Sequence, residues 1–165
     1  MAGELDHLLE TLKRGSAAER SEAAQRLAGL GPEAQPAAVP LVEACGTEDE
    51  SLREWVTAAL EELGPPPEAA VPRLAQLLAD ENLDTAYWAA TLLGRLEEQA
   101  APAVPQLAQA LGEHHELAVR ERAAWALGKI GSAAAAARHP LEAAAGGSER
   151  RLATLAGRAL TQLDG

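Results

Sequence analysis

The chain has 165 residues, enough for a domain with a sizeable core, and its net charge is −11. This charge argues against a nucleic acid or an anionic membrane as the main partner, because both would repel it. Cys45 is the single cysteine, so no intramolecular disulfide can form, and no window has the apolar length of a membrane span or the pattern of a secretory signal. We therefore expect a cytoplasmic protein.

Five segments end in the same way, which predicts a repeat architecture. Their last large apolar residues are 33, 33, 34 and 33 residues apart: Leu30, Leu63, Leu96, Ile130 and Leu163. A proline follows four of these positions after about ten residues: Pro40, Pro72, Pro105 and Pro140. Proline is tolerated in the first turn of a helix, where its missing N–H has no partner in any case. Each of these prolines is therefore predicted to open a helix.

In chain order the predicted repeats cover residues 1–31, 32–64, 65–97, 98–131 and 132–165. Each has a short first helix, a bend and a longer second helix, as at 71–79 and 83–96 in the third repeat. Gly31, Gly64 and Gly131 follow three second helices, where a left-handed residue commonly ends the helix. Glu97 takes this place in the third repeat, so we expect that corner to differ. Because one repeat cannot bury its apolar face alone, the repeats should stack into one all-α solenoid domain, residues 1–165.

Helix geometry assigns faces to each second helix. Positions 0, 3, 4, 7 and 11 before the last apolar residue should form the core; in the fourth repeat they are Ile130, Leu127, Ala126, Ala123 and Val119. The sixth position back is always small, which suits close helix packing: Ala24, Thr57, Ala90, Ala124 and Gly157. Positions 2, 5, 9 and 12 should face away from the core and form an open, concave binding surface.

All the aromatic residues, three Trp and one Tyr, lie on or beside this open surface. Tyr87 and Trp125 should point away from the core. Trp55 and Trp88 lie at the edge of the open surface and could instead close seams between helices. Aromatic side chains supply rigid contact area at protein interfaces. With nearby charges they form the predicted partner-binding set: Glu54, Trp55, Tyr87, Trp88, Glu121, Arg122, Trp125 and Arg158. Glu61 and Arg151 also lie near it.

Two further patterns follow the repeat and are predicted to be structural. Arg20, Arg53 and Arg120 stand ten residues before the last apolar residue, and we expect each to pair with a loop acid. The acidic bends at 46–51, 79–84 and 112–117 place carboxylates near the starts of second helices, where they would act as caps.

The period, the helix-opening prolines and the element VRERAAWALGKIG at 119–131 resemble the HEAT-like repeats first recognised in phycobilisome lyases. The similarity covers residues 5–165 and is weakest in the last repeat, which we expect to be a cap. This resemblance implies a right-handed curved stack with first helices outside and second helices inside. It also implies that the protein holds other macromolecules.

We accordingly predict a non-catalytic scaffold that binds a protein or peptide, with no cofactor, no metal and no nucleic acid. His114 and His115 are adjacent, so on a helix they could not share a face as two metal ligands do. The alternatives come from the family resemblance: a bilin lyase or an accessory or regulatory subunit of an enzyme, and, less favoured by the charge, a HEAT-like DNA glycosylase.

Overall fold

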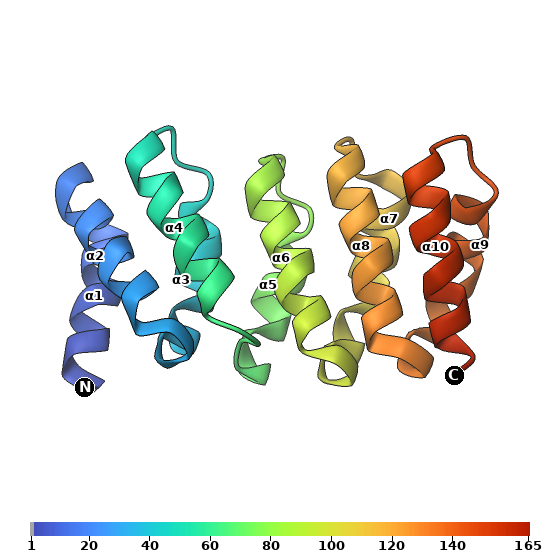
Figure 1. Ribbon diagram of the computed structural model, residues 1–165, viewed down its shortest axis with the longest axis horizontal. Helices are drawn as coiled ribbons and strands as arrows, with labels where there is room; N and C mark the ends of the chain where they lie inside the picture. Colours follow the sequence, from blue (N-terminus) through green and yellow to red (C-terminus); the bar gives the residue numbers. More distant parts are fainter. Residues whose placement is uncertain (1) are drawn as a thin grey trace. The chain divides into compact units, whose positions relative to one another are not determined.

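The computed structural model describes residues 2–165, which form ten α-helices, four 3-10 segments and no strand. The first helices of the repeats are α1 (Ala2–Arg14), α3 (Ala38–Ala44), α5 (Val71–Leu77), α7 (Val104–Glu113) and α9 (Arg138–Ala145). The second helices are α2 (Ala17–Leu30), α4 (Glu50–Glu62), α6 (Leu83–Arg95), α8 (Leu117–Ile130) and α10 (Arg150–Leu163) (Figure 1). The prediction of an all-α solenoid of helix pairs is confirmed.

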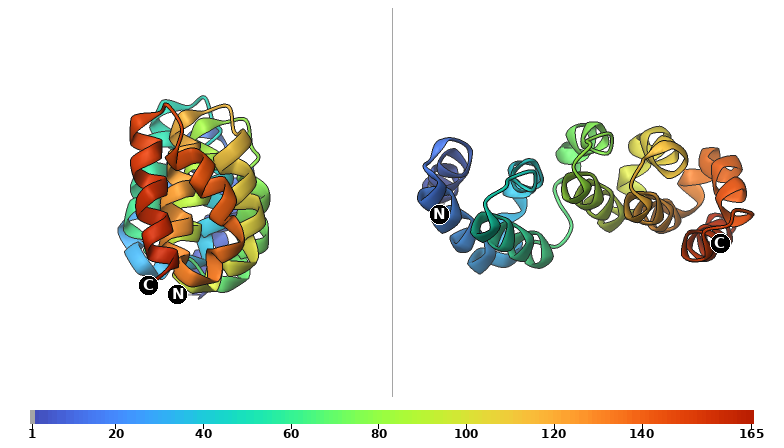
Figure 2. Two further views of the ribbon diagram at one scale, coloured as in Figure 1. Left: turned by 90° about the vertical axis from the view of Figure 1, so that its right-hand side faces the viewer. Right: turned by 90° about the horizontal axis from the view of Figure 1, so that it is seen from above.

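The helices form two compact units. Unit 1 ends at Pro67 and holds α1 to α4, whereas unit 2 runs from Glu68 to Gly165 and holds α5 to α10. In unit 2, α8 packs between α6 and α10, and each second helix packs on its own first helix, which makes two layers (Figures 1 and 2). We call the surface of α6, α8 and α10 that faces away from α5, α7 and α9 the second-helix face.

The core positions predicted for the fourth repeat are all buried, the most exposed being Ile130 at 4%. Of the small positions, Ala24, Ala90 and Ala124 are fully buried, while Thr57 and Gly157 are half-buried. The prolines lie in the first turns as predicted; Pro72 and Pro105, for example, open α5 and α7. Among residues 2–165, no helix is both long and apolar enough to span a membrane.

Side-chain caps fix several helix starts. The Asp49 carboxylate accepts from the Leu52 N–H at 3.1 Å at the start of α4, as the acidic bend predicted. At α6 the cap is Asn82, whose side chain accepts from the Thr85 N–H at 3.1 Å, and the Asp80 carboxylate instead accepts from the Asn82 N–H at 2.8 Å. The first two bends are therefore capping structures, although the capping residue at α6 is not an acid. At the third bend the prediction is wrong, because the side chain of Glu116 at the start of α8 makes no capping hydrogen bond.

The corners after the second helices correct one prediction. Gly31 and Gly131 have positive φ, at 54° and 74°, but their ψ of −128° and −141° lies outside the left-handed helical region. Glu97 also has positive φ, at 52°. Like the two glycines, it begins a seven-residue 3-10 segment; these segments are η1 (Gly31–Ala37), η3 (Glu97–Ala103) and η4 (Gly131–Ala137). The third corner thus follows the common geometry.

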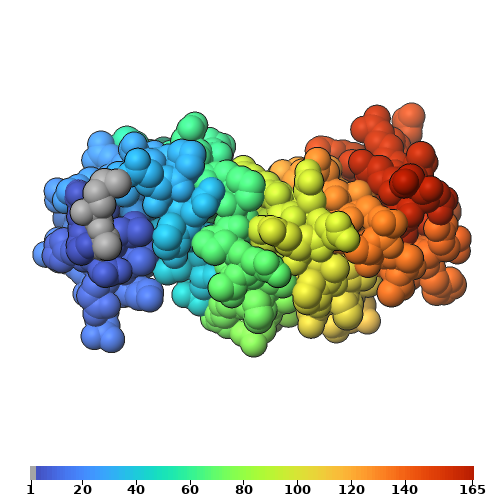
Figure 3. Space-filling model, turned by 90° about the horizontal axis from the view of Figure 1, so that it is seen from below, coloured from blue at the N-terminus to red at the C-terminus, as the bar shows by residue number. Residues whose placement is uncertain are grey.

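The second corner is the one that differs. Gly64 has a φ of 75° but is followed by Pro65, Pro66 and Pro67, and only a three-residue 3-10 segment follows, η2 (Glu68–Ala70). Prolines have no N–H to donate, so this stretch cannot close the 3-10 hydrogen bonds that the other corners make. Figure 3 shows the corner end of the helices, where the segments of unit 2 follow one another in order from green to red.

Candidate partner-binding surface

Trp125 fills the seam between two second helices. Its ring lies against Gly94 of α6, where an added Cβ would overlap the ring. The ring is half-buried, while Gly94 and Thr91, two positions predicted to face the open surface, are buried. That part of the prediction is wrong, because side chains from α8 cover the positions on α6.

Arg122 is stacked between two aromatic rings on the second-helix face. Its Cζ lies 4.0 Å from the centroid of the Trp125 ring and 5.1 Å from that of the Tyr87 ring. Its Nε donates to the Thr91 hydroxyl at 2.8 Å, and that hydroxyl donates to the Tyr87 carbonyl at 2.8 Å. Partial removal from water lowers the pKa of the Arg122 guanidinium; the interaction with Tyr87 opposes this shift, and the nearby positive charge of Arg151 adds to it.

The terminal nitrogens of Arg122 keep hydrogen-bonding capacity. Among residues 2–165, no side chain or carbonyl accepts from its two terminal NH₂ groups, and no buried side-chain nitrogen lacks a partner. These groups must therefore reach solvent, so the surface presents a fixed guanidinium whose outer edge is open to an acceptor.

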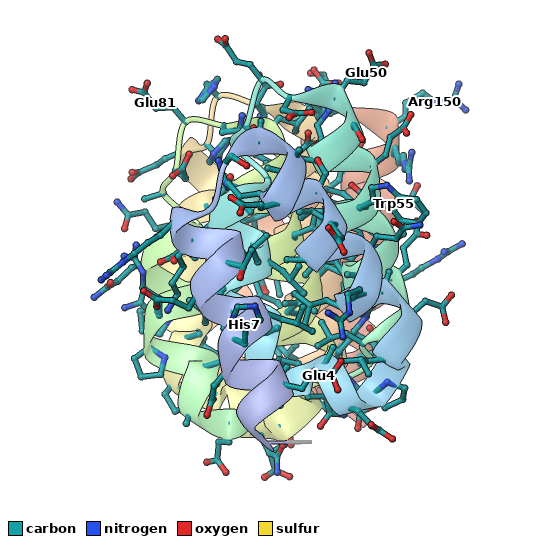
Figure 4. All side chains as sticks on the ribbon, turned by 90° about the vertical axis from the view of Figure 1, so that its left-hand side faces the viewer. Glu4, His7, Glu50, Trp55, Glu81 and Arg150 are labelled. Atoms are coloured by element: carbon teal, nitrogen blue, oxygen red, sulfur yellow. The ribbon has the colours of Figure 1, made fainter. Side chains whose placement is uncertain are left out.

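The neighbouring tryptophan is more deeply placed. Trp88 is 9% exposed, makes an edge-to-face contact with Tyr87 at a centroid distance of 6.1 Å, and has the Arg95 guanidinium 5.6 Å from its ring centroid. Of the two readings left open for Trp88, burial is therefore the observed one. Trp55 is half-buried on α4 of unit 1, and its side chain points to the second-helix side of that unit (Figure 4).

The remaining charged residues of the predicted set differ in their exposure. Glu121 is largely covered, with 14% of its side chain exposed, and pairs at 3.4 Å with Arg151, which is 81% exposed. Arg158 on α10 and Glu54 on α4 are exposed. The structure thus brings four predicted residues of unit 2 into one cluster: Tyr87, Trp88, Arg122 and Trp125. Glu121 pairs instead with α10, and Glu54 and Trp55 belong to unit 1.

Three residues that contact this cluster were not predicted from the sequence as part of the binding set: Thr91, Gly94 and Arg95. A signal for Gly94 was available, because Gly128 occupies the same position, two residues before the last apolar residue, in the next repeat. Gly128 is also a close-contact position, where a Cβ would lie 3.1 Å from the Cα of Ala159 in α10.

Two of the three repeated arginines, Arg20 and Arg120, are structural, but their partner was predicted wrongly. The Nε of Arg20 donates to the carbonyl of Leu12 at 2.9 Å, and the Nε of Arg120 donates to that of Leu111 at 2.9 Å. Both carbonyls lie in the last turn of the preceding first helix, where backbone acceptors lack helical partners. Arg20 and Arg120 thus cap helix ends, where pairing with a loop acid was expected.

A depression lies on the first-helix side of unit 2, between α5 and α7, with a volume of about 420 Å³. His114 lies beside it; its Nδ1 accepts from the Glu116 N–H at 3.1 Å and its Nε2 is 3.0 Å from the Asp80 carbonyl. The His115 ring stacks on that of His114 at 4.7 Å. Within the described chain, no group of three or more His, Cys, Asp or Glu residues is placed to hold a metal ion.

The chain resembles known repeat proteins both in sequence and in fold. A family model described as HEAT repeats matches residues 5–90 and again 71–161. A designed armadillo repeat protein in complex with the peptide (KR)4 has a TM-score of 0.66 and 18% identity, over 98% of this chain and 82% of that chain. An engineered protein solved as a crystal structure has a TM-score of 0.65 and 21% identity, over 97% of this chain and 79% of that one. None of the curated proteins is significantly similar to this sequence.

Proposed function

Since the chain belongs to the HEAT repeat family, we propose that it is a non-catalytic protein-binding module whose second-helix face in unit 2 holds a peptide or protein segment. The observation that carries this proposal is the stack of Tyr87, Arg122 and Trp125 on two neighbouring helices. Aromatic and arginine side chains that remain partly open to solvent on one face are the residues most enriched at binding hot spots.

The alternative is that the stack serves only to join the repeats. Trp125 does fill a seam over Gly94, and this packing alone would explain why a large aromatic side chain is present at this position. Packing does not account for Arg122, however, because partial burial of a guanidinium with open donors costs free energy that an aliphatic side chain would not. A designed relative by fold binds the peptide (KR)4, which supports peptide binding by stacked repeats as a general capacity of this architecture.

The test is affinity capture from a lysate of the source cells, followed by mass spectrometry. The bait variant is Tyr87→Ala combined with Arg122→Gln, which leaves the seam residue Trp125 in place. A matched control is Gln76→Ala with Gln109→Ala, two exposed changes at the depression between α5 and α7. Circular dichroism must first show that both variants are folded.

We expect a protein that is captured by the wild type and by the control but lost with the bait variant. If capture is lost only with the Gln76→Ala/Gln109→Ala control, the binding site lies on the first-helix side, and the proposal is refuted. Incubation with a bilin tests the lyase alternative, which requires a coloured adduct.

The cytoplasm remains our predicted location, because nothing in a chain with one cysteine depends on an oxidising compartment.

A further inference from the structure

Positive charge is concentrated on the second helices of unit 2. α6, α8 and α10 carry seven of the chain's 14 Lys and Arg residues but only two of its 25 Asp and Glu residues. Their net charge is therefore +5 in a chain whose total is −11. The second helices of unit 2, whose outer side is the second-helix face, are therefore cationic as a group, whereas the remainder of the chain is strongly acidic.

Several of these cations already have partners. Arg120 donates to a helix end, Arg151 pairs with Glu121 at 3.4 Å, and Lys129 lies 3.7 Å from a Glu97 carboxylate oxygen. The terminal NH₂ groups of Arg122 do not have an acceptor in the described chain, and Arg158 is exposed on α10. Arg95 lies over the Trp88 ring, and Arg150 is exposed at the start of α10. Arg122 is held in place by two rings and a hydrogen bond, and its terminal groups remain open to a ligand.

Arg122 is also fixed in orientation before any ligand arrives. Its Nε–H bond to Thr91 and the rings of Tyr87 and Trp125 hold the guanidinium plane, so little side-chain entropy would be lost on binding. The two terminal nitrogens of a guanidinium match the two oxygens of a carboxylate. An arriving anion would moreover compensate the partial loss of water around this charge.

We propose that the second-helix face of unit 2 binds an acidic peptide segment, in which one Asp or Glu carboxylate pairs with Arg122 and an adjacent apolar side chain lies against Trp125 and Tyr87. This inference rests on the proposed function and names the chemistry of its partner. Arg158 adds attraction for a second carboxylate.

A nucleic acid is the competing polyanion, and the charge distribution disfavours it. A strand longer than the face would run past the acidic remainder of the chain, and repulsion acts over a Debye length of about 8 Å at physiological salt. A short peptide with a few carboxylates can stay within the cationic face.

The experiment measures fluorescence anisotropy with three short labelled peptides of one length, in which Leu and Trp alternate with Asp and Glu, with Asn and Gln, or with Lys and Arg. A single-stranded DNA of the same net charge as the acidic peptide is the fourth probe. We expect the acidic peptide to bind at least ten-fold more tightly than the amide peptide, the basic peptide and the DNA, and to weaken as salt is raised.

Three variants locate the binding. Arg122→Gln and Arg158→Glu should each weaken the acidic peptide, the first by at least ten-fold, whereas Lys13→Gln, an exposed change of one charge on α1, should have no effect. Arg158→Glu keeps the test valid if Arg122→Gln is unstable, because Arg158 is at the surface.

Equal binding of the acidic and amide peptides, tighter binding of the DNA, or no binding of any probe would each overturn the inference. None of these results would touch the proposed function, which fails only if the Tyr87→Ala/Arg122→Gln bait retains every protein that the wild type captures.

Discussion

Two glycines on neighbouring helices of unit 2 should respond oppositely to the same substitution. At Gly128 of α8 an added Cβ would lie 3.1 Å from the Cα and 3.2 Å from the Cβ of Ala159, and it would overlap the Gln162 side-chain amide. At Gly157 of α10 no heavy atom lies within 4 Å of the corresponding point. The two sites therefore share a helical backbone and differ in the space beside it.

The magnitudes follow from two opposing effects. Replacing Gly by Ala inside a helix stabilises it by about 1 kcal/mol. Gly157→Ala should show this gain in full. Gly128→Ala gains the same amount, but α8 and α10 must separate by a few tenths of an ångström, and overpacking of this kind costs about 1–3 kcal/mol. We expect Gly128→Ala to lower the free energy of unfolding by up to about 2 kcal/mol.

The assay is urea unfolding followed by far-ultraviolet circular dichroism, with both variants measured beside the wild type. The dependence of the unfolding free energy on urea should stay unchanged, which shows that the same surface is exposed in each case. If both variants are stabilised equally, α8 and α10 do not approach as closely as the structure shows, and the reasoning is refuted.

Three local substitutions test the corners and caps. Glu97→Gly should raise the free energy of unfolding by about 1 kcal/mol in thermal melts, because it removes a side chain from a residue with positive φ; no gain would mean that the corner is unstrained. Arg120→Ala should lower it by about 1–2 kcal/mol in urea, since the Leu111 carbonyl loses its donor; an unchanged midpoint would contradict the capping role. The hydrogen bond from the Ser16 backbone lowers the pKa of Glu19, so this contact stabilises the fold above the unfolded pKa of Glu19 and is lost as the pH falls through the folded one. Glu19→Ala should therefore destabilise the protein less in acid than at neutral pH, and a loss independent of pH would argue against the capping box.

The fold could be predicted because its information is periodic. A spacing of 33 or 34 residues fixes where each helix pair recurs, and the helical angle then fixes which positions are buried, as Val119 and Leu127 show. The corner at Glu97 was predicted wrongly because a single residue type was given more weight than the repeat. The packing of the following 3-10 segment, with Ala100 and Ala103 fully buried, determines the backbone there.

The surface was harder to predict because it depends on neighbouring repeats. The angle of a residue on its own helix says that Trp125 points away from the core, but it cannot say that the ring leans onto Gly94 of the preceding second helix. The same limit applies to Thr91, which faces outward by angle and is covered by Arg122. Side chains that cross from one repeat to the next narrow the open surface.

The sequence shows where positive charge is concentrated, whereas the structure shows which of these charges are available to a ligand. The excess of Lys and Arg on the second helices of unit 2 can be counted in the sequence once the helices are placed. The count does not tell which cation is available, because Glu121 engages Arg151 and Glu97 lies beside Lys129. Only the observed contacts leave Arg122 with open donors between two rings. A carboxylate is the group that this arrangement suits, since two parallel hydrogen bonds require a guanidinium whose plane is already fixed.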